Sequence, residues 1–157
     1  KLKKINPKIK FSSDFIIGYP GETEKDFNST LKLLKEINYI NSYSFIYSPR
    51  PGTPASKMIK GDDNILKKRL TKFQKIAEKI KTDYKNSLIN KKSLVLFENK
   101  VFGKDEFFGR DEFSNSVIVK SAKNLVGNIE SVDIINGNQN TLFGTIKEKQ
   151  YKKVFAA

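Results

Sequence analysis

Two stretches decide the fold of this chain: residues 13–23 read SDFIIGYPGET, and residues 47–54 read YSPRPGTP. In each, a short apolar strand runs into a loop rich in proline and glycine, which cannot continue the strand. The two loops are therefore expected at the same edge of a parallel sheet, where α/β folds place their ligand sites. One strand–helix–strand unit cannot cover both faces of such a sheet, so we expect the chain to be part of a larger protein.

The two strands are predicted at residues 11–17 and 42–47. The segment between them has the pattern of an amphipathic helix. Thr23 and Asp26 have the spacing of a capping box, with a carboxylate near the positive end of the helix. The apolar positions that follow lie on one helical face, and they are Phe27, Leu31, Leu34 and Ile37. This face is predicted to cover the sheet.

A longer helix is predicted after Gly61, within a linker that spans residues 61–89. Apolar residues recur at helical spacing from Leu66 to Leu88. The other face is basic, and it carries Lys67, Lys68, Arg69, Lys72, Lys75, Lys79 and Lys85. Such a face is either simply solvated or faces the phosphates of a nucleic acid, and the pattern leaves both possibilities open.

Beyond residue 90 the apolar period changes from helical to alternating, which is typical of β-strands. Strands are predicted at Ser93–Glu98, Val117–Val119, Asn128–Ile135 and Thr141–Lys147, with Phe107–Gly109 as a weaker candidate. Short strands at this spacing, separated by glycines, predict a small antiparallel β-barrel of OB-like size. We place this domain at residues 90–150 and a frayed tail at residues 151–157, after an α/β part at residues 1–60.

Composition limits the chemistry of the chain. Its 157 residues contain no cysteine and no histidine, which excludes disulfides, cysteine-ligated metals, thiolate nucleophiles and imidazole bases within them. No apolar run is long enough for a membrane span, so a cytoplasmic protein is expected.

The net charge of +13 is unevenly distributed, with +6 in residues 1–60, +6 in residues 61–92 and only +1 in residues 93–157. A basic region of this kind is typical of polyanion binders. A lysine-biased genome would place the same charges on any surface, so charge alone does not decide for RNA.

The two loops offer ligand groups. Gly18 and Gly21 allow close backbone approach, and Glu22 can accept hydrogen bonds from a hydroxyl or amine. Arg50, between two prolines, presents a guanidinium suited to a carboxylate or phosphate. A plain strand-to-helix turn and an exposed loop arginine are the alternatives. No pair of side chains forms an acid–base or nucleophile–base set, so no catalytic residue and no metal ligand is predicted.

Residues 12–27 (SSDFIIGYPGETEKDF) and 43–55 (YSFIYSPRPGTPA) closely resemble a late strand, helix and loop of the radical S-adenosylmethionine (SAM) methylthiotransferase family. The distal part resembles a TRAM domain, through Gly109-Arg110, Asn115 and residues 140–144. The resemblance implies α/β plus all-β architecture: the C-terminal part of a radical SAM (β/α) barrel, a linker helix and a TRAM barrel.

The family's activity is implied by the resemblance and not by the residues themselves. It implies addition of a methylthio group at C2 of N6-isopentenyladenosine-37 in tRNA, with SAM and two [4Fe–4S] clusters as cofactors. Because this chain lacks cysteine, every cluster ligand is expected upstream of Lys1, and the chain alone should be inactive. The implied partners are the tRNA anticodon stem-loop and sulfur and electron donors, with a monomeric protein and no membrane.

Candidate site residues follow from matching the family's motifs position by position. The residues expected at the SAM pocket are Ile16, Gly18, Gly21, Glu22 and Arg50. The residues expected to contact tRNA are Arg110 and Asn115 of the barrel, and Lys68, Lys72, Lys75 and Lys79 of the basic helix. Phe143 departs from the family, where arginine is common before the glycine. The basic helix is therefore expected to supply more of the phosphate attraction than the barrel.

Two other interpretations stay open. The chain could be a stand-alone RNA-binding protein in which the strand–helix–strand part is only a scaffold. It could also belong to a sister enzyme that modifies a threonylcarbamoyl-adenosine tRNA or a ribosomal protein. Arg50 disfavours the ribosomal-protein branch, where an acidic residue is usual. A cysteine triad upstream would favour an enzyme over the stand-alone binder.

Overall fold

The computed structural model describes residues 1–146 and divides the chain into two units, residues 1–84 and the unit from residue 85 onward. The first unit is α/β and the second contains a closed β-barrel, so the predicted fold class is confirmed. Lys147, the predicted end of the last strand, and the predicted tail at 151–157 lie outside the described residues. The domain limits placed at residues 60 and 89 stay predictions.

The first unit contains the predicted strand–helix–strand segment. Its elements in chain order are α1 (Leu2–Ile5), β1 (Ser12–Ile17), α2 (Glu24–Ile37), β2 (Asn41–Ile46), the 3-10 helix η1 (Pro54–Lys57) and α3 (Asp63–Asn86). Strands β1 and β2 are parallel, with Ser12 opposite Asn41 and Ile17 opposite Ile46. Both strands therefore end at the same edge, as the two loop sequences predicted.

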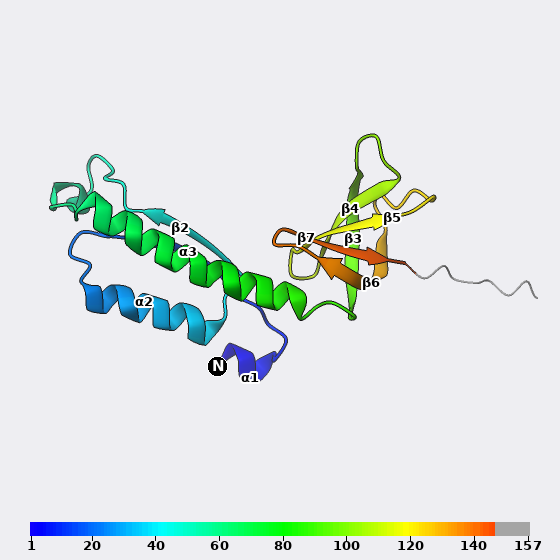
Figure 1. Ribbon diagram of the computed structural model, residues 1–157, viewed down its shortest axis with the longest axis horizontal. Helices are drawn as coiled ribbons and strands as arrows, with labels where there is room; N and C mark the ends of the chain where they lie inside the picture. Colours follow the sequence, from blue (N-terminus) through cyan, green and yellow to red (C-terminus); the bar gives the residue numbers. More distant parts are fainter. Residues whose placement is uncertain (147–157) are drawn as a thin grey trace, which may run out of the picture. The chain divides into compact units, whose positions relative to one another are not determined.

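The core of this unit lies between the strand pair and the two long helices (Figure 1). Its buried residues come from β1, α2 and α3, and they are Ile17, Phe27, Leu31, Leu34 and Phe73. The predicted capping box is present, because the Thr23 hydroxyl accepts from the Asp26 amide at 3.2 Å and the Asp26 carboxylate accepts from the Thr23 amide at 3.0 Å. These two bonds fix where α2 begins, directly after the loop at residues 18–22.

The second unit is a barrel of five strands. They are β3 (Lys92–Lys100), β4 (Glu106–Asp111), β5 (Ser116–Lys120), β6 (Ile129–Gly137) and β7 (Thr141–Thr145). The ladder runs β3-β4-β5-β7-β6 and closes from β6 to β3. Every pair is antiparallel except β5 and β7, which are parallel. After β5 the chain first forms β6, which pairs with β3, and β7 then runs antiparallel to β6 and parallel to β5. The barrel is therefore mixed, where the strand pattern predicted an antiparallel one.

The weakly predicted strand at Phe107–Gly109 is a full barrel strand, β4. Gly109 blurred the pattern, and the structure explains why a glycine is needed there. A Cβ at this position would run into the backbone carbonyl of Leu96 and the side chain of Val95 on β3. The glycine lets the two backbones approach inside a narrow barrel.

Alternate residues of the barrel strands point inward and form a second core. Its buried strand residues are Val95, Phe97, Phe107, Val117, Val119, Val132, Ile134 and Leu142, and Leu125 from the loop between β5 and β6 packs with them. Among residues 1–146, none of the helices combines the length and apolar character that crossing a membrane requires.

Candidate functional site

A hollow of about 350 Å³ opens at the carboxyl ends of β1 and β2. Its walls include Ile16, Tyr19 and Phe45, and the loop after β2 adds Tyr47 and Arg50. The structure thus brings together Ile16 and Arg50, two of the residues predicted for the cofactor. Apolar walls with a few polar groups are typical of small-molecule sites.

Two tyrosines form one wall of this hollow. The rings of Tyr19 and Tyr47 meet edge to face, with their centroids 5.3 Å apart. Tyr47 is only 9% exposed, and its hydroxyl has no hydrogen-bond partner among the residues that the structure describes. A buried hydroxyl without a partner is costly, so a ligand or a water that bonded it would be stabilised there.

The hollow continues into an uncovered face of the strand pair. Ile16, Tyr43 and Phe45 are each about 60% exposed there, on the face opposite the core that α2 and α3 cover. Ile16 and Phe45 are direct neighbours across the two strands. An apolar patch of this kind on a sheet usually marks a site of interaction with another surface.

Arg50 is carried by a rigid turn. The Thr53 amide and hydroxyl both donate to the Arg50 carbonyl, at 3.3 and 2.8 Å. Gly52 has φ +83°, which suits the third position of a type II turn after Pro51. The side chain of Arg50 is exposed, and no ion pair ties it to another residue within 1–146. Its guanidinium is therefore available to a carboxylate or phosphate.

The loop after β1 is stabilised from within. Gly18 and Gly21 both have positive φ, at +75° and +88°, which only glycine adopts readily. The Gly18 amide donates to the Glu22 carboxylate, and the Glu22 amide donates to the Tyr19 carbonyl at 2.8 Å. The side chain of Glu22 is only 11% exposed. Its carboxylate thus faces the loop's own backbone.

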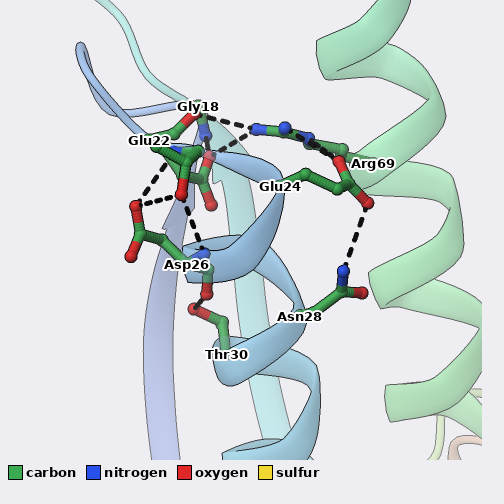
Figure 2. A network of polar contacts seen from close by, with 8 residues as sticks. Gly18, Glu22, Glu24, Asp26, Asn28, Thr30 and Arg69 are labelled. Carbon is green, nitrogen blue, oxygen red and sulfur yellow. Dashed lines mark hydrogen bonds and ion pairs between the residues drawn. The ribbon is translucent and has the colours of Figure 1, made fainter.

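Arg69 of α3, which the helical pattern places on the outward basic face, reaches this loop and contacts Glu22 and Glu24 (Figure 2). Its side chain is only 12% exposed and forms ion pairs with Glu22 at 3.5 Å and Glu24 at 2.9 Å. Arg69 is therefore neither solvated nor free to face phosphates, the two possibilities that the helical pattern left open for this face. Helical periodicity cannot reveal a contact with a loop that lies 45 residues earlier in the chain. The one available signal was an arginine among lysines, since arginine is the residue of choice for paired carboxylates.

The four predicted RNA-binding lysines of α3 are all exposed: Lys68, Lys72, Lys75 and Lys79. Their spacing of four, three and four residues places them along one face of the helix. Lys79 donates to Asp83 at 2.7 Å, and the Lys72 ammonium lies 5.8 Å from the centre of the Phe27 ring. The face therefore presents a row of cations from one rigid element.

The two predicted barrel residues differ in their availability. The side chain of Arg110 is 48% exposed, with its guanidinium 5.4 Å from the centre of the Phe108 ring and 3.4 Å from Glu98. Asn115 is only 4% exposed, and its side-chain amide and backbone amide both donate to Asp111 at 2.8 Å. Asn115 therefore stabilises the turn between β4 and β5, while Arg110 lies at the surface.

Metal ligands are not gathered anywhere within residues 1–146, where no three His, Cys, Asp or Glu side chains are placed to share an ion. The whole chain contains no cysteine. An iron–sulfur cluster therefore finds no thiolate ligand in this chain.

Comparisons with known proteins point to one group. No family model matches the chain. The chain is 47% identical over 98% of its length to the tRNA-2-methylthio-N(6)-dimethylallyladenosine synthase of Pelagibacter ubique (strain HTCC1062), of which it covers 34%. It is 42% identical over 93% of its length to the synthase of that name from Ruthia magnifica subsp. Calyptogena magnifica, covering 33% of it. It is 37% identical over 96% of its length to the synthase of that name from Herminiimonas arsenicoxydans, of which it covers 35%.

The chain spans about a third of the length of the curated relatives it matches. The identity extends over both units, since each of these matches covers more than nine-tenths of the chain. The resemblance stated from the sequence is therefore confirmed, and this chain is homologous to the C-terminal region of the tRNA-2-methylthio-N(6)-dimethylallyladenosine synthases.

Proposed function

We propose that this chain is the C-terminal region of a tRNA methylthiotransferase that adds a methylthio group at C2 of N6-isopentenyladenosine-37. The observation that carries the proposal is the 47% identity to a synthase of that name over 98% of the chain. The complete protein would act in the cytoplasm as a monomer, with sulfur and electron donors as further partners.

The first unit would contribute part of the SAM pocket. The hollow at the ends of β1 and β2 fits the two ends of this cofactor chemically, because Ile16 and Phe45 suit the adenine ring and Arg50 suits the carboxylate. The Tyr47 hydroxyl is a further polar group at the same wall. The loop after β1 would reach the ligand through Tyr19, which lines this hollow, while Gly18 and Gly21 allow the turns on either side of it.

SAM would supply the radical and the methyl group, and two [4Fe–4S] clusters would supply electrons and sulfur chemistry. Clusters need thiolates, which this chain does not have. Their ligands must therefore come from segments outside these 157 residues. The residues of this chain would bind and orient SAM and exclude water from it.

Binding of tRNA would be shared by the two units. The exposed lysine row of α3 supplies positive charge for phosphates, and the row is Lys68, Lys72, Lys75 and Lys79. On the barrel, Arg110 is exposed beside Phe108, so its guanidinium can reach a phosphate or stack on a base. Asn115 would act indirectly, by holding the β4–β5 turn that follows Arg110.

The test uses the complete protein, purified without oxygen and with its clusters reconstituted. Incubation with SAM and a tRNA that carries N6-isopentenyladenosine-37 should convert that nucleoside to its 2-methylthio form, detected by mass spectrometry after digestion. A matched tRNA with threonylcarbamoyladenosine-37 should stay unmodified. Conversion of the second tRNA alone would assign the protein to the sister branch, and conversion of neither would overturn the proposal.

A second measurement tests the pocket itself. Arg50→Ala should weaken SAM binding by roughly tenfold or more, because a charge-assisted bond to a carboxylate is lost. Lys57→Ala, which removes a cation from the nearby helix η1 but not from the hollow, is the matched control. Equal SAM affinity in both variants and the wild type would remove Arg50 from the pocket.

A further inference from the structure

Arg69 has no part in the function proposed above, yet it links α3 to the loop that follows β1 (Figure 2). We infer that Arg69 is a positioning residue for the SAM pocket: it holds the Glu22 carboxylate against the Gly18 amide and so sets the backbone of residues 18–22. This inference rests on the proposed function for the identity of the ligand. The contacts themselves are properties of the first unit.

Glu22 places a negative charge in a mostly buried position of the loop. Its carboxylate is nine-tenths buried and accepts the Gly18 amide. A buried carboxylate is unstable unless a cation or several donors compensate it. Arg69 is that cation, with Nη1 3.5 Å from the carboxylate and 3.3 Å from the Glu22 carbonyl oxygen. Without it, Glu22 is expected to turn toward water and release the Gly18 amide.

The geometry of these contacts requires an arginine at position 69. Nε and Nη2 of Arg69 both donate to Glu24 Oε2, at 3.2 and 2.9 Å, while Nη1 faces Glu22. The guanidinium also lies 5.3 Å from the centre of the Phe27 ring. A planar fork can bond two carboxylates and pack on a ring at once, whereas the point charge of lysine cannot.

The same helix, α3, contacts the loop a second time through Leu66. Leu66, one helical turn before Arg69, lies against Gly18 so closely that a Cβ there would overlap its side chain. Gly18 is thus packed by Leu66, and its amide is bonded to a carboxylate that Arg69 holds. The carboxylate of Glu22 is used within the protein, so its contribution to ligand binding is through the position of Tyr19, the residue of this loop that lines the hollow. Loss of Arg69 should therefore act on the pocket without removing any ligand contact.

The experiment compares variants of the complete protein by hydrogen exchange and by SAM binding. Arg69→Met keeps the packing on Phe27 and removes the charge, and Lys67→Met removes a charge from an exposed position of the same helix as the control. Arg69→Met should speed exchange within residues 18–24 and weaken SAM affinity by roughly ten- to a hundredfold, with a smaller effect on kcat. Lys67→Met should match the wild type in both measurements.

A double variant separates positioning from simple packing. Glu22→Gln is neutral, yet its side-chain oxygen can still accept the Gly18 amide. Adding Glu22→Gln to Arg69→Met should therefore restore slow exchange at Gly18 and much of the SAM affinity. If Arg69 only packs α3 against the sheet, the second substitution cannot rescue the first.

The outcomes are distinct. A wild-type protein that does not bind SAM would sink the proposed function, while the exchange data would still judge the role of Arg69. A wild type that binds SAM, with Arg69→Met unchanged in exchange and affinity, would overturn the inference. Arg69→Met could also speed hydrogen exchange in α2 and β2. In that case, failure of Glu22→Gln to restore slow exchange at Gly18 overturns the inference.

Discussion

In the barrel unit every strand pairs with two neighbours, whereas in residues 1–84 the strands β1 and β2 pair only with each other. The barrel therefore has no open edge, while the α/β unit has two edges and an apolar face carrying Ile16, Tyr43 and Phe45. Open edges and exposed apolar faces are liabilities in a folded protein unless something covers them. The barrel strands thus close on themselves, whereas the strand pair of the α/β unit leaves edges and an apolar face that another surface could cover.

The largest expected effect of this difference concerns folding in isolation. Residues 85–157 alone should fold cooperatively, because a closed ladder and a full core lie within them. Residues 1–84 alone should give poor dispersion in proton–nitrogen NMR spectra and a broad thermal transition, since a two-stranded sheet is marginally stable. The whole chain is the reference. A sharp transition and a dispersed spectrum for residues 1–84 at low concentration would contradict the comparison.

Charge separates the two units as well. Residues 1–84 carry 18 basic and 9 acidic side chains, and the remainder carries 12 and 8. Changing the α3 row, Lys68, Lys72, Lys75 and Lys79, to glutamate should weaken binding of an anticodon stem-loop RNA by about a hundredfold and flatten its salt dependence. Fluorescence anisotropy at two salt concentrations measures both effects.

The matched control reverses four exposed lysines of the barrel unit, namely Lys91, Lys92, Lys120 and Lys123. The change in net charge is the same, so a general electrostatic effect would weaken RNA binding equally in both variants. If α3 has a specific role, the control variant should lose less than about tenfold in RNA affinity. Equal losses would assign the attraction to total charge, and a larger loss in the control would assign it to the barrel.

The packing of the closed barrel leads to the next prediction. Gly109→Ala should lower the free energy of unfolding of the barrel by about 1–3 kcal/mol, because the new Cβ meets the Leu96 carbonyl, which cannot move without breaking the ladder. Gly61→Ala in the first unit is the control, since its Cβ would lie 3.4 Å from a flexible leucine side chain. Urea unfolding of the whole chain measures both. A Gly109→Ala barrel as stable as the wild type would show that the ladder can shift.

Local patterns account for most of what the sequence predicted correctly. The capping box at Thr23 and Asp26, the apolar face of α2 and the proline-rich loop around Arg50 each depend on residues that are close in the chain. The parallel pairing of β5 with β7 was beyond such reasoning, because it depends on where the chain returns after β6. Strand patterns show which face is buried but not which strands become neighbours.

The candidate site shows the same limit at single residues. Arg69 contacts Glu22 and Glu24 across more than forty positions, and the helical period, which placed it on the basic face, could not show these contacts. Asn115 was predicted from a motif, and the structure shows its amide bonded to Asp111 inside a turn. A motif identifies a position and not what its side chain touches. The exposed lysine row needed only the helical period, and each of its members is exposed as that period predicts.

The smallest expected effect is a pH dependence confined to the first unit. Donation from the Thr23 hydroxyl and amide lowers the pKa of Asp26 below its ordinary value of 3.8. The unfolded chain therefore binds a proton at this site before the folded protein does as the pH falls. The stability from this bond is fully present above the ordinary pKa and is lost as the pH falls through the folded pKa.

Asp26→Asn should flatten the acid dependence of the first unit's urea midpoint and leave that of the barrel unchanged. An acid slope in the first unit that Asp26→Asn does not alter would mean that another carboxylate governs it. Asp63, whose pKa Lys60 lowers, would be the next to replace.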